Sequence, residues 1–107
     1  MSWIVEALDD IVTAELTALP RDMRAKFEHI TLMIMSHGLG RMREPYVKHI
    51  EKSLWEMRLI GRDGIARAFY VTATGKRVIV LRAFRKKTQK TPRSEIELAL
   101  KRAKEVT

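Results

Sequence analysis

The sequence lacks cysteine altogether, which excludes a disulfide framework and any thiolate site. It also lacks any apolar run close to the roughly 20 residues that a membrane-spanning helix needs. The first ten residues become acidic at once, without the basic start and apolar stretch of a signal peptide. No internal repeat, low-complexity tract or long linker divides the chain. We therefore expect one soluble domain over residues 1–107, located in the cytoplasm and not attached to a membrane.

Familiar catalytic patterns are absent as well. His29, His37 and His49 show no metal-ligand spacing, and the chain contains neither an HExxH motif nor a Gly-rich phosphate loop. The acidic residues fall mostly in expected helices, which argues against a two-metal carboxylate nuclease. Met23 and Met57 lie on apolar faces and are assigned to packing. The sequence thus predicts a protein that needs no metal and no cofactor.

What the sequence has in excess is positive charge, with a net charge of +8. Residues 41–93 contain 15 of the 21 lysines and arginines and four of the 13 acidic residues, whereas residues 1–40 are acidic overall. Charge concentrated in one part of a chain is typical of proteins that bind a phosphate-rich partner. A generally basic surface without a nucleic-acid partner is the alternative.

Apolar spacing predicts a strand at residues 2–8, followed by two helices joined by a short turn. A carboxylate at Asp9 or Asp10 can cap the first helix, which extends to about Ala18. The second helix begins at Pro20, ends at Gly38 and carries one apolar face, formed by Met23, Phe27, Ile30 and Ile34.

Three strands and a helix are expected in the second half of the chain, after an irregular segment at residues 39–50. The strands cover residues 54–60, 65–73 and 77–84. The last helix starts with Thr91 as its cap and Pro92 in its first position. This order predicts an α+β fold: an antiparallel sheet with an N-terminal strand, a two-helix hairpin, a three-strand meander and a C-terminal helix, with the helices packed on one side.

The first strand of the meander has two distinct faces, because side chains alternate along a strand. Trp55, Met57 and Leu59 share one face, which we expect to meet the core. Trp55 should therefore be largely buried. The other face carries Leu54, Glu56 and Arg58.

A run of cations follows the third strand of the meander, without an acidic residue among them: Arg82, Arg85, Lys86, Lys87, Lys90 and Arg93. Arg58 and Arg67 lie within the two preceding strands. Neighbouring strands are about 4.8 Å apart, so both arginines can point into one groove beside the run. An exposed strand face without such a groove is an equal alternative.

A groove of this kind can cleave RNA without a metal. The ribose 2′-hydroxyl is a built-in nucleophile next to the phosphate. Preorganised arginine and lysine side chains stabilise the charge that develops on the phosphate oxygens. A lysine crowded by other cations has a lowered pKa and can exchange protons. The same set of residues equally describes simple RNA binding.

From residue 48 to residue 102 the pattern becomes specific. The segments KHIEKSLWEMRL, GIARAFYV and VIVLRAFRKKTQKTPRSEIELALKR follow one another. They contain a Leu-Trp-Glu-hydrophobic-Arg strand, an arginine followed by a tyrosine in the next strand, and a KKTxKTP turn before a helix that ends in KR. With these motifs the chain resembles the phage-derived subgroup of RelE/HigB-like toxins over nearly its whole length.

The resemblance implies the toxin of a type II toxin–antitoxin system, a metal-independent endoribonuclease that cleaves mRNA on the ribosome. By their places in the motifs, Arg58 and Arg67 match the strand cations that contact the phosphate. Lys86 and Lys87 match the basic position that assists the transition state or the leaving group. The resemblance and the cation run together give five candidate RNA contacts: Lys48, Arg82, Arg85, Lys90 and Arg93.

The resemblance also implies a partner. A toxin of this kind is held inactive by a cognate antitoxin, expected here to be a small helix-turn-helix protein. The tail AKEVT lacks the tyrosine or histidine that many relatives carry near the C-terminus, which leaves the general base unassigned. Two alternatives stay open: a non-catalytic basic RNA- or DNA-binding protein on the same fold, and a phage structural or interaction protein without nucleic-acid affinity.

Overall fold

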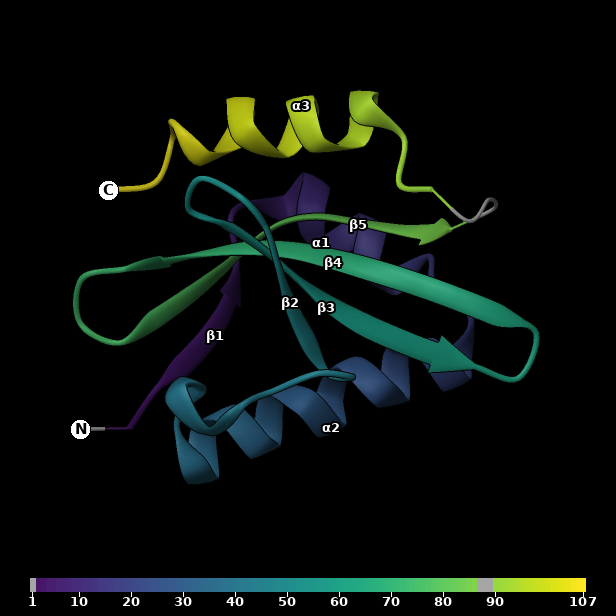
Figure 1. The fold of residues 1–107 in the computed structure, drawn as a ribbon, viewed down its shortest axis with the longest axis horizontal. Helices are drawn as coiled ribbons and strands as arrows, with labels where there is room; N and C mark the ends of the chain where they lie inside the picture. The colour runs from purple at the N-terminus through teal and green to yellow at the C-terminus, as the bar shows by residue number, and fades with distance from the viewer. Residues whose placement is uncertain (1, 87–89) are drawn as a thin grey trace.

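The computed structural model describes residues 2–86 and 90–107. Three α-helices, a 3-10 turn (η1) and five strands make up the fold (Figure 1). The helical elements are α1 Asp10–Thr17, α2 Arg21–His37, η1 Leu39–Arg41 and α3 Arg93–Ala103. The strands are β1 Ile4–Ala7, β2 Val47–Glu51, β3 Leu54–Gly61, β4 Gly64–Ala73 and β5 Arg77–Lys86. The predicted α+β class is confirmed.

The helix pair forms where its capping residues predict it. Asp9 caps α1 by accepting a hydrogen bond from the backbone N–H of Val12 at 3.0 Å. Gly38 ends α2 with φ +86°, a conformation that favours glycine. The predicted apolar face of α2 is buried, as Met23 and Ile30 show. None of the helices in residues 2–86 and 90–107 is long and apolar enough to cross a membrane.

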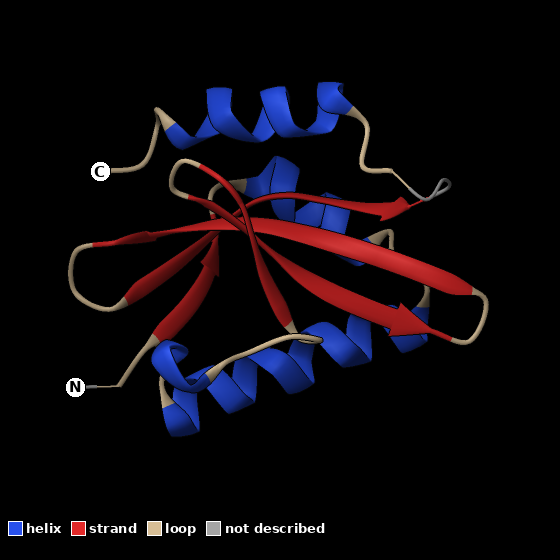
Figure 2. Cartoon of the chain, in the orientation of Figure 1, coloured by secondary structure: helices blue, strands red, loops and turns tan. Residues whose placement is uncertain are grey.

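The five strands form one sheet in the order β1-β5-β4-β3-β2, with the predicted meander at its centre (Figure 2). The meander is antiparallel, but β1 pairs with β5 in parallel. The prediction of an antiparallel sheet therefore needs correction at this edge. The chain passes through two helices and the other three strands between β1 and β5, so no hairpin forces them to be antiparallel.

The other edge strand, β2, lies in the segment 39–50 that was predicted to be irregular. It pairs antiparallel with β3, with Lys48 opposite Glu56 and His49 opposite Trp55. The strand is short and largely polar, so it carries little apolar periodicity of its own. Its conformation is set by the pairing with β3, which the local sequence does not reveal.

Helices cover both faces of the sheet, and not one face as predicted. α2 lies along one face and α3 along the other (bottom and top of Figure 1). The reason lies in β4, whose alternating side chains are apolar on both sides. Ala68 and Tyr70 pack with α2, whereas Phe69 and Val71 pack with α3. A sheet that is apolar on both faces needs cover on both.

Trp55 is 38% exposed, so the prediction that it is largely buried is wrong. The predicted orientation of β3 is nevertheless confirmed. Met57 and Leu59, on the same face of the strand as Trp55, are completely buried in the hydrophobic cluster that includes α2. Trp55 lies beside the edge strand β2, where residues after the end of α2 form the cover and leave a pocket open. Trp55 is therefore left partly open to solvent at this edge of the sheet.

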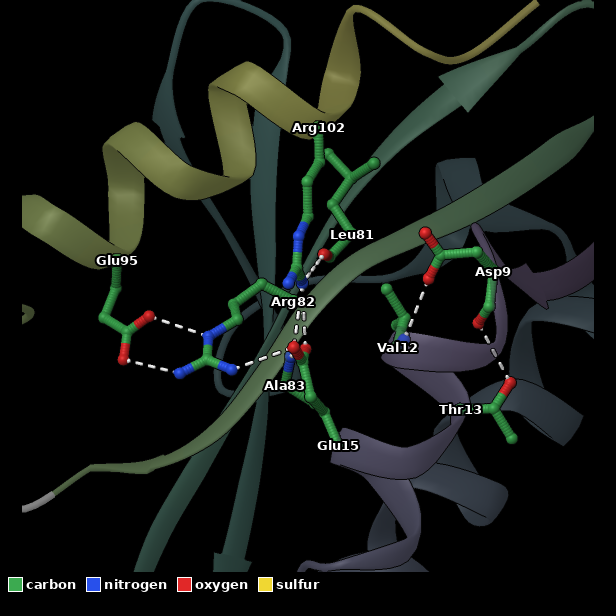
Figure 3. A network of polar contacts seen from close by, with 9 residues as sticks. All are labelled: Asp9, Val12, Thr13, Glu15, Leu81, Arg82, Ala83, Glu95 and Arg102. Carbon is green, nitrogen blue, oxygen red and sulfur yellow. Dashed lines mark hydrogen bonds and ion pairs between the residues drawn. The ribbon is translucent and has the colours of Figure 1, made fainter.

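Glu15 of α1 connects three elements through its carboxylate (Figure 3). It pairs with Arg82 of β5 at 3.0 Å and with Arg102 of α3 at 2.9 Å. It also accepts the backbone N–H of Ala83 at 3.1 Å, while Arg102 donates to the carbonyl of Leu81 at 2.8 Å. These contacts occupy the edge of β5 beyond the end of its pairing with β1. The network thus protects an open strand edge and fixes α1 and α3 to the sheet.

Glu15→Ala should lower the free energy of unfolding by about 2–4 kcal/mol, because it removes the acceptor that two half-buried guanidinium groups and a backbone N–H share. Glu97→Ala is the matched control, since Glu97 is exposed and pairs with Arg93 at 3.7 Å on the surface of α3. Its loss should leave stability nearly unchanged. Urea unfolding of both variants measures the difference, and equally small effects would show that Glu15 does not hold the helices.

Candidate functional site

Four of the predicted cations gather on the sheet face that carries α3. Residues opposite each other in neighbouring strands point to the same face. Arg58 lies opposite Arg67, and Lys48 lies opposite Glu56, two residues before Arg58. Lys86 lies opposite Ile65, which precedes Arg67 by two residues and so points to the same face. These five side chains therefore share one face, and we call them the cationic cluster.

Arg67 and Glu56 form a buried ion pair at the base of the cationic cluster. They are 3% and 2% exposed, and Nη1 of Arg67 lies 2.5 Å from Oε1 of Glu56. Burial lowers the pKa of Arg67, while the Glu56 carboxylate opposes that change. Nε of Arg67 and Oε2 of Glu56 are enclosed without a hydrogen-bond partner. Each residue thus keeps bonding capacity that the fold itself does not use.

Arg58 and Lys86 lie closer to the surface. The Arg58 side chain is 30% exposed, and its Nε lies 4.0 Å from Oε1 of Glu56. Lys86 is half-buried. Its pKa is lowered from the ordinary value of a lysine, first by loss of hydration and then by the positive charges of Arg67, Arg58 and Lys48. The Glu56 carboxylate opposes this shift in part, which shows that the whole cluster acts on one amine.

The cationic cluster sets four positive side chains against one carboxylate, so it attracts anions. Four strands supply the five side chains, which fixes their positions before a ligand arrives. Donors fixed in this way stabilise charge that develops on a bound group. Lys86, with its lowered pKa, is the member most able to transfer a proton. The arrangement suits the binding and electrostatic stabilisation of a phosphate.

Two other predicted RNA contacts are engaged in ion pairs outside the cationic cluster. Arg82 pairs with Glu15 and with Glu95, whose Oε1 lies 2.7 Å from its Nε (Figure 3). Arg82 thus attaches α3 to the sheet, and its predicted RNA contact stays a prediction. Arg93 is more exposed and forms a bidentate salt bridge with Glu51.

The remaining predicted contacts are dispersed. Arg85 lies opposite Ala66, so it points to the α2 face, and its Nη2 donates to the carbonyl of Asp63 at 2.9 Å. Lys90 is exposed ahead of α3. Lys87, predicted with Lys86 as a catalytic residue, lies outside the described residues. Of the predicted residues that the structure describes, the cluster therefore brings together Arg58, Arg67, Lys86 and Lys48, and it leaves Arg82, Arg85, Lys90 and Arg93 apart.

Glu56 is the residue of the site that sequence reasoning missed. The strand pattern places it on the face of Arg58, but the pattern does not show which cation it neutralises. Its position two residues before Arg58 was the available signal, because such spacing puts both side chains on one face. Among residues 2–86 and 90–107, no three His, Asp or Glu side chains come together in a group that could hold a metal ion.

A family model described as phage derived protein Gp49-like (DUF891) matches residues 14–104. No curated protein sequence matches the chain. The solved structure of a mutant of the E. coli toxin RelE in the free state is similar, with a TM-score of 0.66 at 16% identity over 95% of this chain and 98% of that one. The archaeal RelE–RelB complex from Pyrococcus horikoshii OT3 gives a TM-score of 0.57 at 20% identity, over 81% and 98%. At these identities the likeness shows a RelE fold.

The Lys86 amine should titrate below the ordinary lysine range, and its pKa should respond to its neighbours. Arg58→Ala removes a repelling charge and should raise the Lys86 pKa, whereas Glu56→Gln removes an attracting charge and should lower it. NMR of the Lys86 ε-carbon during a pH titration measures all three values. Identical pKa values in the parent and both variants would contradict the proximity of these groups.

Proposed function

The chain belongs to the Gp49-like family of phage-derived proteins, and from its RelE fold we propose that it is the toxin of a type II toxin–antitoxin system. We propose further that it is an endoribonuclease that cleaves mRNA. The convergence of Arg58, Arg67, Lys86 and Lys48 around one carboxylate carries this proposal. A rigid cationic face of this kind fits a chain of phosphodiesters.

In the proposed reaction the ribose 2′-hydroxyl attacks the adjacent phosphorus, its proton passes to solvent, and the bond to the 5′-oxygen of the next nucleotide breaks. The products are a 2′,3′-cyclic phosphate and a 5′-hydroxyl. Arg58 binds the non-bridging oxygens and stabilises the charge of the transition state. Arg67, held beneath it by Glu56, adds its charge from the base of the site. Lys86 donates a proton to the leaving oxygen, which its lowered pKa favours.

Cations around this centre are proposed to hold the RNA and the ribosome. Lys48 is exposed at the edge of the cationic cluster. Lys87 directly follows Lys86 and remains a second candidate for proton transfer. Contacts to phosphates position a nucleic acid without reading its sequence. The further candidates for this role are Arg82, Arg85, Lys90 and Arg93.

An antitoxin is part of the proposal. One structure with a similar fold is a RelE–RelB complex, which supports a protein partner for this chain. We propose a small helix-turn-helix protein that occludes the cationic cluster with acidic or bulky surface. Co-expression of the adjacent small reading frame should suppress growth arrest and give a stable complex. Unchanged toxicity would exclude that gene product as the antitoxin.

The second candidate function is RNA or DNA binding without cleavage. The enclosure of Arg67 favours it, because this side chain is 4% exposed and already paired with Glu56. A site that holds a phosphate without cutting needs little more than the half-buried Arg58 and the exposed Lys48. Cleavage and binding must therefore be measured separately.

Arg58→Ala should slow single-turnover cleavage of mRNA on programmed ribosomes by on the order of 100-fold, because it removes a donor aimed at charge that develops in the transition state. Arg67→Ala should have a comparable effect. RNA and ribosome binding, measured in parallel, should change far less. Lys90→Ala should instead weaken binding mildly and reduce its salt dependence.

Arg24→Ala is the matched control for the loss of one positive charge, because Arg24 is exposed on α2, across the sheet from the cationic cluster. Thermal unfolding verifies that every variant is folded. If Arg58→Ala and Arg67→Ala cleave at the parent rate once bound, the site is wrongly assigned. If the parent cleaves no RNA, with or without ribosomes, the binding function replaces the catalytic one.

A further inference from the structure

A pocket on the α2 face of the sheet has no part in the proposed cleavage. It encloses about 430 Å³ beside η1 and the β2–β3 edge. Three aromatic residues, Trp3, Trp55 and Tyr70, contribute to its walls, and Arg43 and Thr72 supply polar groups. We call it the aromatic pocket. It lies across the sheet from the cationic cluster, because Trp55 and Arg58 occupy opposite faces of β3.

The hydroxyl of Tyr70 is an unused polar group at this pocket. Tyr70 is 1% exposed, and burial alone raises the pKa of its phenol, without a contribution from a hydrogen bond. The hydroxyl has no partner among the described residues, yet it is not one of their fully enclosed polar atoms. Tyr70 is also one of the residues that line the pocket, which makes its hydroxyl a candidate contact for a ligand there. A nearly buried hydroxyl without a protein partner gains a hydrogen bond when a ligand brings a polar group into the pocket.

Trp55 presents a stacking surface at the same pocket. It is 38% exposed although its side chain is large and apolar. His49 packs against it with ring centroids 5.1 Å apart and planes at 64°, which holds the indole from one side. The side that lines the pocket stays open. A held indole with an open face is a platform on which a nucleic-acid base can stack.

The charge at the aromatic pocket favours an anion. Arg43 is charged, and none of the residues that line the pocket is acidic. These groups match the features of a nucleotide. An indole can stack on the base, the Tyr70 hydroxyl can hydrogen-bond to the edge of the base, and the Arg43 guanidinium can pair with the phosphate. An apolar side chain from a protein partner would contact the walls but leave the hydroxyl of Tyr70 buried without a partner.

We propose that the aromatic pocket binds one unpaired nucleotide of an RNA, with its base on Trp55 and its phosphate at Arg43. The inference rests on the proposed function, since the RNA is also the substrate. Edge strand β2 joins the two sites, because His49 faces the pocket side and Lys48 faces the cationic cluster. An RNA that crosses this edge touches both. The pocket then selects single-stranded RNA and holds it at a nucleotide that is not cut.

Tryptophan fluorescence reports on this pocket directly, because both tryptophans of the chain border it. The full chain is titrated with adenosine 5′-monophosphate and with a short 2′-O-methyl oligoribonucleotide, which cannot undergo attack by a 2′-hydroxyl. Both ligands should quench the fluorescence saturably. Tyr70→Phe should weaken binding by about three- to tenfold and leave the unfolding midpoint unlowered, because the lost hydroxyl has no partner in the fold.

Two further variants test the stacking and the charge. Trp55→Leu should weaken binding of a labelled oligonucleotide, followed by fluorescence anisotropy, by about tenfold or more. Arg43→Ala should reduce both the affinity and its salt dependence. Arg24→Ala is the matched control, since Arg24 lies near the opposite end of α2 from η1, and it should change neither.

Arg58→Ala separates the pocket from the cleavage site. It should slow cleavage while adenosine 5′-monophosphate still quenches as in the parent. A parent that binds nucleotides in this way but never cleaves RNA would contradict the proposed activity and support the pocket. Failure of both ribonucleotide ligands to quench saturably would overturn the inference. Quenching by the antitoxin without quenching by RNA would also overturn it and assign the pocket to a protein partner.

Discussion

The guanidinium of Arg67 is buried on the central strand of the sheet, where a charge without a partner would destabilise the fold. Glu56, on the neighbouring strand, provides the opposite charge at 2.5 Å. The pair forms the base of the cationic cluster, and the charges of both residues act on Lys86 above it. The same carboxylate also lies 4.0 Å from Nε of Arg58, nearer the surface. One buried ion pair thus organises the proposed phosphate site.

The sheet face that carries this ion pair has two parts, one apolar and covered by α3, the other cationic. α3 packs on apolar residues of β4 and β5, while the cations occupy other positions of the same face. The attachment of α3 uses charge as well, since Arg82 and Arg102 both meet the carboxylate of Glu15. Basic residues of similar appearance in the sequence therefore have different roles. Arg82 and Arg102 attach α3 to the sheet through Glu15, whereas Arg58, Lys48 and Lys86 belong to the cationic cluster.

Local sequence patterns predicted the helices and the meander, because caps such as Asp9 and Gly38 and strand alternation act between near neighbours. Strand β2 and the parallel pairing of β1 were missed, since each depends on a distant strand. Within the site, the family motifs matched Arg58 and Arg67 to strand cations that contact the phosphate, while strand spacing alone left open whether the two share a groove. The burial of Arg67 and the role of Glu56 follow from a diagonal contact between strands, which requires knowledge of the register. The exposure of Trp55 likewise depends on tertiary cover at the edge of the sheet.

A double-mutant cycle between Glu56 and Arg67 tests this account most directly. Glu56→Gln, Arg67→Met and the double variant are compared in urea unfolding and in single-turnover cleavage. The account predicts that each single variant loses about 3–5 kcal/mol of stability, because it leaves one buried charge unpaired, and that the double variant regains most of this loss. Cleavage should stay far below the parent rate in all three. A stable double variant that cleaves RNA as fast as the parent would contradict the claim that this ion pair organises the site.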